Sequence, residues 1–411
     1  MAATLWGKVY NNDSFAGELR QEPGGRCVFT YDPGYLAVGS PAIALTLLRQ
    51  AAPHICERGL HPFFDNLVAE GWLRNAQARA LKVDVGNRFA LLLAFGHDCA
   101  GAVSVIDPNP VAEPSVDLDD PTAAAALVSR SSLSGVQAKL LVVQSGKRFR
   151  PARRDENSNF IAKLPSGTLR DIVENEFLTT VANRALLPDD QVVDAIIGTV
   201  DGIDGRALLV RRFDRRRSGT KIHFEEFNQL FGRRSGDDKY EASYDDLGAF
   251  LRVTPGCTAA DAWRLYRRIL ACFLTGNTDA HLKNFAMFHT PDGLRLTPAY
   301  DLVAAALYPE YHALALAIGN AANFKIENLK PKHLVSLGDA YGLSRPLLIE
   351  TFKALDQRRT ATEKLVRHEA KKIGEEKLGD KLLDYMEKRW NGSFSSTGQY
   401  LSKKPSGEDA D

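Results

Sequence analysis

One stretch of the chain indicates both its fold and its chemistry: Asn277 Thr278 Asp279 Ala280 His281 Leu282 Lys283 Asn284. A second string, Pro298 Ala299 Tyr300 Asp301, follows it. An aspartate such as Asp279 can accept the proton of an attacking hydroxyl group. Asn284 and Asp301 supply hard oxygen ligands of the kind that hold Mg2+ against the phosphates of ATP. The stretch therefore predicts a phosphoryl-transfer site, with Asp279 as the catalytic base and Asn284 and Asp301 as metal ligands.

The spacing of these residues matters more than their separate identities. Taken alone, Asp279 shortly after Gly276 is more typical of a turn residue that caps a helix. An aspartate, an asparagine five residues later and a second aspartate downstream form the order in which protein kinases carry their catalytic base and metal ligands. The positions of Asn284 and Asp301 therefore favour the catalytic interpretation.

A buried helix is expected to lead into this stretch. Its apolar stripe at helical spacing consists of Trp263, Tyr266, Leu270 and Phe273. The catalytic loop should therefore begin where that helix ends.

Length and composition are those of an ordinary globular protein. The chain has 411 residues, of which 44% are hydrophobic and 25% charged, so two or three domains or lobes are expected. Its 52 basic and 51 acidic residues give a net charge of +1, which provides no global field to draw the protein onto DNA or an anionic membrane. Any association with nucleic acid is therefore expected to be local or to depend on a partner.

The cysteines and the first residues favour a cytoplasmic protein. The five cysteines are scattered, odd in number and free of CxxC spacing, which disfavours a disulfide framework or a zinc site. Residues 1–10 lack a basic start followed by an apolar run, and no segment approaches ~18 uninterrupted apolar residues. We expect a reducing compartment, with neither export nor a membrane-spanning segment.

The hydrophobic pattern divides the chain into five parts. Strands are expected at 140–143, 160–164 and 207–212, with a helix at 171–186 between the second and third of them. Four prolines and five acidic residues between 107 and 121 indicate a linker, and the residues past Asn391 are rich in Gly, Ser and charge. The predicted parts are an amino-terminal α+β subdomain (1–106), a linker (107–128), a strand-rich lobe (129–244), a helical catalytic lobe (245–392) and a disordered tail (393–411).

Further strings occur in order along the chain. They are Pro62 Phe63 Phe64 Asp65 Asn66 Leu67 with Glu70 Gly71, Ser131 Ser132 Leu133 Ser134 Gly135 Val136 Gln137 Ala138 Lys139, Ile161 Ala162 Lys163 Leu164 Pro165, and Arg212 Phe213 Asp214 Arg215. Together with the Asp279 and Asp301 motifs they resemble the HipA family of bacterial serine/threonine kinases, the toxin halves of toxin–antitoxin pairs. The resemblance covers nearly the whole chain up to Asn391. It implies an α+β, two-lobed protein-kinase-like fold with an extra amino-terminal subdomain and an all-helical carboxy-terminal lobe.

The resemblance also implies ATP and Mg2+ as cofactors. Lys163, expected on a strand, carries a point charge suited to ATP phosphates, and Glu176 on the next helix would pair with it. The other nucleotide-site residues that it implies are Gln137, Lys139, Phe213, His281 and Lys283. In the family a serine-rich loop covers the nucleotide and carries an autophosphorylated serine whose position matches Ser132, with neighbouring Ser131 left open. Phosphorylation there would add ~2 negative charges beside the ATP phosphates and so silence the enzyme.

Several residues have simpler explanations or depart from the family pattern. Arg211 stands where relatives often have a glutamate, so side-chain contacts to adenine or ribose are not expected there, and backbone contacts near Phe213 remain. Lys163 alone would more often be a surface or salt-bridged lysine. His281 and His289 lack the spacing of a zinc site, so His281 is expected to brace the loop. The arginines around 211–217 are most simply a solvated loop.

The resemblance implies partners, and the residues leave two other functions open. The implied partners are a helix-turn-helix antitoxin like HipB, operator DNA held through it, and a translation component such as an aminoacyl-tRNA synthetase as substrate. Sugar, choline and aminoglycoside kinases place an Asp and an Asn at the same five-residue offset, which leaves a small-molecule phosphotransferase open. A catalytically inactive scaffold that binds an antitoxin is the third possibility, against which the intact catalytic residues argue.

Overall fold

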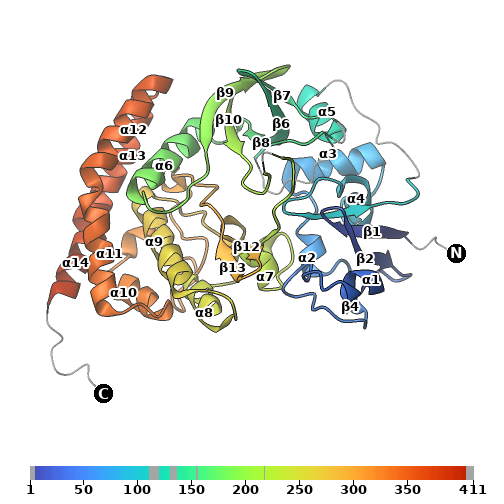
Figure 1. The fold of residues 1–411 in the computed structure, drawn as a ribbon. Coiled ribbons are helices and arrows are strands. Elements are labelled where there is room, and N and C mark those ends of the chain that lie inside the picture. Colours follow the sequence, from blue (N-terminus) through green and yellow to red (C-terminus); the bar gives the residue numbers. More distant parts are fainter. Residues whose placement is uncertain (1–4, 111–119, 130–136, 154–155, 217, 404–411) are drawn as a thin grey trace. The chain divides into compact units, whose positions relative to one another are not determined.

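The chain folds into two compact units, which Figure 1 colours along the sequence. The computed structural model describes residues 5–110, 120–129, 137–153, 156–216 and 218–403. The first unit comprises Met1–Val173 and Asp194–Lys239, and the second comprises Glu174–Val193 and Tyr240–Asp411. Each unit therefore draws on two separate stretches of sequence.

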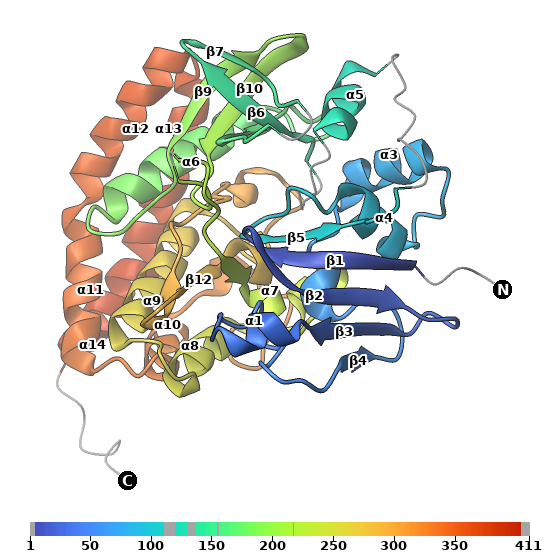
Figure 2. The same ribbon diagram turned by 45° about the vertical axis from the view of Figure 1, so that its right-hand side comes forward.

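The amino-terminal part of the first unit is a subdomain of strands and short helices. Its elements are β1 (Leu5–Asn11), β2 (Ser14–Gln21), β3 (Cys27–Tyr31), α1 (Pro33–Ala37), β4 (His54–Cys56), α2 (Pro62–Asp65), α3 (Gly71–Leu81), α4 (Arg88–Phe95) and β5 (Val103–Ile106). The strands form one antiparallel sheet in the order β4-β3-β2-β1-β5, and Figure 2 shows them side by side. One face of this sheet is covered by aromatic side chains, and the rings of Phe29 and Phe64 lie 5.4 Å apart. The subdomain therefore has a hydrophobic core of its own.

The rest of the first unit is a small barrel with short flanking elements. Its elements are α5 (Pro121–Val128), β6 (Lys139–Ser145), β7 (Arg148–Pro151), β8 (Phe160–Lys163), β9 (Ala195–Val200), β10 (Ile203–Arg211), β11 (Phe224–Glu226), α7 (Phe227–Leu230) and the 3-10 turn Asp237–Tyr240. The strands close in the order β10-β8-β6-β7-β9. Leu140, Ala162 and Leu209 face one another across β6, β8 and β10 and are fully buried. Apolar side chains therefore fill the interior of the barrel.

The second unit is mainly helical. Its elements are α6 (Ile172–Leu186), α8 (Tyr244–Val253), α9 (Ala259–Thr275), the 3-10 turns Leu282–Asn284, Ala305–Leu307 and Ile326–Asn328, the strands β12 (Ala286–Thr290) and β13 (Gly293–Leu296), and then α10 (Pro331–Ala340), α11 (Arg345–Gln357), α12 (Arg359–Ile373), α13 (Glu376–Arg389), the π turn Trp390–Phe394 and α14 (Ser395–Ser402). Helix α9 is buried along almost its whole length. Among the described residues, no helix combines the length and apolar character needed to cross a bilayer.

The predicted positions of several elements are confirmed. The strands expected at 140–143, 160–164 and 207–212 are β6, β8 and β10, and the helix expected at 171–186 is α6. The buried helix expected before the catalytic loop is α9. The pattern of apolar residues was therefore sufficient for these elements.

The predicted linker 107–128 was too long. Its last residues, Pro121–Val128, form α5, and the carboxylate of Asp120 accepts a hydrogen bond from the backbone N–H of Thr122 at 3.0 Å. A proline is well placed in the first turn of a helix, since its missing N–H would have no partner there. Ala126 is fully buried in the barrel core, which holds this helix in place. Residues 111–119 lie outside the described part of the chain.

The prediction of a disordered tail from residue 393 was wrong for 393–402. These residues are helical, and Leu401 is only 2% exposed. The ring of Phe394 lies 5.6 Å from that of Phe352 on α11. The guanidinium of Arg345 donates to backbone carbonyls at the end of α14, including that of Lys403 at 2.8 Å. In this segment, the apolar residues at helical spacing determine the structure in spite of a composition rich in Gly and Ser.

Two boundaries of the predicted lobes also need correction. The carboxy-terminal lobe is not all-helical, because β12 and β13 form a hairpin around Pro291 and Asp292 with Met287 opposite Leu296. Residues 174–193, expected in the strand-rich lobe 129–244, belong to the second unit. The buried carboxylate of Asp190 accepts hydrogen bonds from Arg268 on α9 at 2.7 Å, which ties this segment to the helices. Burial acts to raise the pKa of Asp190, but its arginine partners hold it at about 2.

Candidate active site

Helix α9 fixes the start of the catalytic loop. The hydroxyl of Thr258 caps its first turn by accepting from the N–H of Asp261 at 3.1 Å. The helix ends at Gly276, whose φ of 75° lies in the left-handed region. The N–H of Asn277 then donates to the carbonyl of Cys272 at 2.8 Å and closes the last turn. The segment carrying Asp279 thus leaves a buried helix at a defined point.

The glycine at the end of α9 has no room for a side chain. A Cβ at Gly276 would lie 2.7 Å from Cε1 of Tyr385 and 3.2 Å from Cβ of Ala306. Gly374 ends α12 with a similar φ of 76°, and among the described residues no neighbouring atom lies within 4 Å of such a Cβ. The two glycines differ in crowding and share their backbone conformation.

This difference predicts unequal effects of alanine. We expect Gly374→Ala to lower the free energy of unfolding by ~1 to 2 kcal/mol, the cost of a left-handed side chain. Gly276→Ala should cost ~1 to 3 kcal/mol more, because its neighbours must move. Urea unfolding of both variants measures the difference. Equal losses would contradict the steric role assigned to Tyr385 and Ala306.

The residues on both sides of Asp279 are held by hydrogen bonds. The hydroxyl of Thr278 donates to the carbonyl of Tyr311 at 2.6 Å, and the carbonyl of Thr278 accepts from the N–H of Ala315 at 2.8 Å. The phenol of Tyr244 donates to the carbonyl of Ala280 at 3.1 Å. Thr278 and Ala280 are buried, whereas Asp279 is partly exposed. The loop therefore presents the Asp279 carboxylate from a fixed backbone, as a catalytic base requires.

The structure brings Asn284 next to Asp301. The Oδ1 of Asn284 accepts from the N–H of His281 at 3.2 Å, and its Nδ2 lies 3.5 Å from the carbonyl oxygen of Asp301. The Nδ2 of Asn277 is also 3.5 Å from that carbonyl. Asp301 itself has a φ of 57°, which is uncommon for a residue other than glycine. Residues held in this region cluster at functional sites, where the surrounding structure maintains them.

These residues fit a magnesium ion by their chemistry. The Asp301 carboxylate and the second lone pair of Asn284 Oδ1 are hard oxygen donors, which Mg2+ prefers. A narrow cavity reaches Asn284 but is not lined by Asp301, and its lining includes Arg268, Cys272 and Asn277. Burial raises the pKa of the Cys272 thiol to about 12, so this lining group is neutral at physiological pH. The candidate donor set is therefore limited to the oxygens of Asn284 and Asp301, with no thiolate beside Asn284.

His281 and Lys283 lie in the same loop and are largely buried. His281 is 8% exposed, and its ring packs edge-on against Tyr240 with 5.5 Å between centroids. Lys283 is 5% exposed, and its backbone carbonyl accepts from the phenol of Tyr300 at 2.8 Å. The bracing role expected for His281 stays a prediction. Contacts of either residue with a nucleotide stay predictions.

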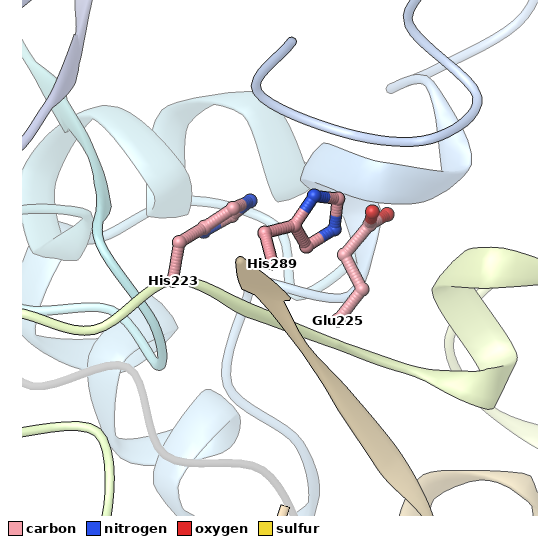
Figure 3. A group of neighbouring side chains, drawn as sticks. All are labelled: His223, Glu225 and His289. Carbon is pink, nitrogen blue, oxygen red and sulfur yellow. The ribbon is translucent and has the colours of Figure 1, made fainter. Parts of the chain in front are cut away.

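His289, the other histidine considered at first, lies on β12 of the second unit. Figure 3 draws it with His223 and Glu225, which come from the first unit. Within the first unit the Nε2 of His223 lies 2.9 Å from the carbonyl of Ile43, and Glu225 accepts from the N–H of Leu45 at 2.7 Å. These contacts hold residues 43–45 of the subdomain against the strand β11.

Three of the nucleotide-site residues predicted in the first unit, Gln137, Lys139 and Lys163, gather at one end of the barrel, whereas Phe213 follows the opposite end of the β8–β10 pair. Lys163 is opposite Lys139 across β8 and β6, and the Nε2 of Gln137 donates to the carbonyl of Leu164 at 2.7 Å. Lys163 is 6% exposed. Ser132 lies outside the described residues. Glu176 is 3% exposed and belongs to the second unit, so its ion pair with Lys163 stays a prediction.

The string Arg212 Phe213 Asp214 Arg215 is largely buried, and the expectation of a solvated loop was wrong for its arginines. The guanidinium of Arg212 donates to Asp214 at 2.9 Å and to Asp98 of the subdomain at 3.1 Å. Arg215 donates to both carboxylates as well. Burial acts to raise the pKa of Asp98, but the two arginines hold it far below its usual value. This network joins the subdomain to the barrel, and Phe213 packs 5.1 Å from Phe224 beside it.

Comparison with known proteins shows the family. Residues 7–106 match the model described as the HipA N-terminal domain, and residues 131–372 match the HipA-like C-terminal domain. This chain belongs to the HipA family. A putative kinase, Y4dM, of Sinorhizobium fredii is 31% identical over 81% of this chain and 85% of its own length. The serine/threonine-protein kinase toxin HipA of Shewanella oneidensis is 30% identical over 72% of this chain and 74% of its own length.

A solved structure shares the HipA fold. It is that of Shewanella oneidensis HipA in complex with HipB and its operator DNA, and it superimposes with a TM-score of 0.75. The match covers 96% of this chain and 99% of that chain at 23% sequence identity. The mixed α+β, protein-kinase-like fold predicted from the sequence is thereby confirmed, apart from the hairpin and boundaries corrected above.

Proposed function

We propose that this HipA family member is an ATP- and Mg2+-dependent protein serine/threonine kinase and the toxin of a toxin–antitoxin pair. One observation carries the proposal: the loop that presents Asp279 also holds Asn284 within 3.5 Å of the Asp301 backbone. A base and two hard oxygen ligands are what phosphoryl transfer requires of the protein. The names of the two curated relatives, one of which is a kinase toxin, support the same conclusion.

In this proposal each residue has a separate task. Asp279 accepts the proton of the substrate hydroxyl, while the fixed backbone of Thr278 and Ala280 keeps its carboxylate in position. Asn284 and Asp301 hold the metal ion, which when bound neutralises charge on the phosphate oxygens. Lys163 adds a positive charge from β8, and the Gln137 contact with Leu164 fixes the strand end next to it.

The activity is tested by incubating the purified protein with radiolabelled ATP and Mg2+, alone and with candidate proteins. We expect label on the protein itself and on a translation component such as an aminoacyl-tRNA synthetase. Wild-type protein that labels neither itself nor any other protein would overturn the proposal. A panel of metabolites is the control, since consumption of ATP with no labelled protein would identify a small-molecule phosphotransferase.

Autophosphorylation is expected in the serine-rich loop, at Ser132 or at neighbouring Ser131. The added phosphate repels the phosphates of ATP, so the modified protein should lose most of its transfer rate. Intact-mass spectra before and after Mg2+-ATP should differ by the mass of one phosphate, and peptide mapping assigns the serine. Ser132→Ala should abolish the shift if Ser132 is the site, and Ser134→Ala is the matched control. A phosphate outside residues 131–134 would contradict this regulation.

We also propose a cytoplasmic helix-turn-helix antitoxin as partner. The support is the fold shared with HipA of the HipA, HipB and operator DNA complex. With a net charge of +1 the chain itself offers no strong general attraction to DNA. A mobility-shift experiment should therefore show retarded operator DNA only when the antitoxin is present.

A further inference from the structure

Helix α6 buries polar side chains on one face. Asn175, Thr179 and Asn183 follow one another at intervals of four residues and are 2%, 0% and 1% exposed. Residues four apart lie on the same side of a helix, so these three form one row, here called the polar stripe. A buried polar group costs free energy unless it is hydrogen-bonded, and an apolar side chain would fill this space at lower cost. The stripe therefore requires an explanation in terms of its partners.

One end of the stripe holds the segment that follows Asp301. The carboxamide of Asn175 accepts from the N–H of Ala304 at 2.9 Å and donates to the carbonyl of Ala304 at 3.2 Å. The N–H of Ala304 also lies 3.1 Å from the hydroxyl of Thr179, which donates to Asn175 Oδ1 at 3.1 Å. Both backbone groups of Ala304 are thus bound to α6, three residues beyond Asp301.

The other end of the stripe contacts the helix that carries the catalytic loop. The Nδ2 of Asn183 donates to the carbonyl of Thr179 at 2.9 Å and lies 3.4 Å from the hydroxyl of Thr275. Thr275 is the last residue of α9, directly before Gly276. The segment after Asp301 also reaches this point, since the N–H of Ala306 donates to the carbonyl of Gly276 at 2.9 Å. The segment that follows Asp301 and the end of helix α9 therefore both contact the same face of α6.

We propose that the polar stripe of α6 is a positioning device that fixes the segment carrying Asp301 relative to the loop carrying Asp279 and Asn284. This inference rests on the proposed kinase function. The three groups come from separate stretches of chain, and catalysis is sensitive to displacements of ~1 Å between such groups. Hydrogen bonds in a buried, low-dielectric environment hold geometry more firmly than apolar packing, because they are directional. Asn175, Thr179 and Asn183 act here as positioning residues and do not touch the reacting atoms.

The test uses the full chain and variants at Thr179. Thr179→Val keeps the shape of the side chain and removes the hydroxyl, whereas Thr179→Ser keeps the hydroxyl and is the matched control. Asn175→Ala is the second variant. We expect Thr179→Val and Asn175→Ala to raise the Mg2+ concentration for half-maximal rate by ~10-fold and to lower kcat by ~10- to 100-fold. KM for the protein substrate should stay within twofold, and Thr179→Ser should behave like the wild type.

A second measurement does not depend on catalysis. Hydrogen exchange of the Ala304 amide should accelerate at least ~10-fold in Thr179→Val and Asn175→Ala, but not in Thr179→Ser. The inference would be overturned if Thr179→Val and Asn175→Ala only lowered the melting temperature and changed neither the Mg2+ dependence nor the exchange rate of the Ala304 amide. The stripe would then be an ordinary part of the core. A wild type that transfers no phosphate would refute the proposed function. The exchange rate of Ala304 would still decide whether the stripe holds this segment.

Discussion

Replacing Asp279 by alanine is expected to remove most phosphoryl transfer while leaving the fold intact. A positioned base contributes ~10^2 to 10^4 in rate, so the loss should fall in that range. The fold should survive because the loop is held by the hydroxyl of Thr278 and the carbonyl of Ala280, and the Asp279 side chain is partly exposed. Transfer of radiolabel from ATP measures the rate, and thermal unfolding measures the fold. Asp279→Asn should lose activity similarly, because the amide cannot accept the proton.

The matched control for this experiment is an exposed aspartate in the same unit. Asp356 lies on the exposed side of α11, and Asp356→Ala should keep the rate of the wild type. An Asp279→Ala variant with a wild-type rate and a normal melting temperature would remove Asp279 from the mechanism. The proposed function would then need another base.

The catalytic stretch could be singled out from the sequence because its information is local, and the roles of its residues stay predictions. Asp279 and Asn284 sit five residues apart in one loop, so any fold that buries the helix before them keeps them close. The strands β6, β8 and β10 were predictable for the same reason, since each contains a short continuous run of apolar residues, which is typical of a buried strand. The expectation that Asn284 and Asp301 lie close together came from the order of these residues in protein kinases as well as from the local pattern. In the structure the Nδ2 of Asn284 lies 3.5 Å from the carbonyl oxygen of Asp301.

The polar stripe and the arginine network were not predictable in this way. Asn175, Thr179 and Asn183 show helical spacing, but polar residues at that spacing are more typical of a solvated face. Their burial depends on Ala304, which is distant in the sequence and has no distinguishing side chain. Arg212 likewise finds its partner Asp98 across more than a hundred residues. Long-range pairs of this kind leave no local signal in the sequence. The two asparagines of the polar stripe, Asn175 and Asn183, were only a weak indication of buried polar contacts.

The predictions of a disordered tail and of a long linker were wrong for a different reason. They rested on composition and not on the spacing of apolar residues, so the Gly and Ser residues near 393–402 outweighed their apolar neighbours. Phe394 and Leu401 are buried, and they lie on one side of the terminal helices. A few well-spaced apolar residues are enough to dock a short helix when a partner such as Phe352 is available.

Asp301 allows stability and activity to be separated, because its backbone and its carboxylate make different demands. Its φ of 57° suits Gly and Asn better than Ala. Asp301→Gly and Asp301→Asn should therefore unfold at or above the wild-type temperature, while Asp301→Ala should lose ~1 to 2 kcal/mol. All three lack the carboxylate, so each should lose ~10^3-fold in transfer rate, corresponding to the several kcal/mol that a correctly held metal ion contributes.

The comparison among these variants decides what Asp301 is for. If its left-handed backbone were merely tolerated and the carboxylate served the fold, the stability order would follow loss of charge, and Asn, Gly and Ala would all be destabilised. If the carboxylate serves the metal ion, stability follows backbone preference while activity is lost uniformly. Thermal unfolding with and without Mg2+ completes the test, since stabilisation by Mg2+-ATP should be present in the wild type and absent from all three variants. An Asp301→Asn protein that keeps both the stabilisation by Mg2+-ATP and the transfer rate would exclude Asp301 as a ligand.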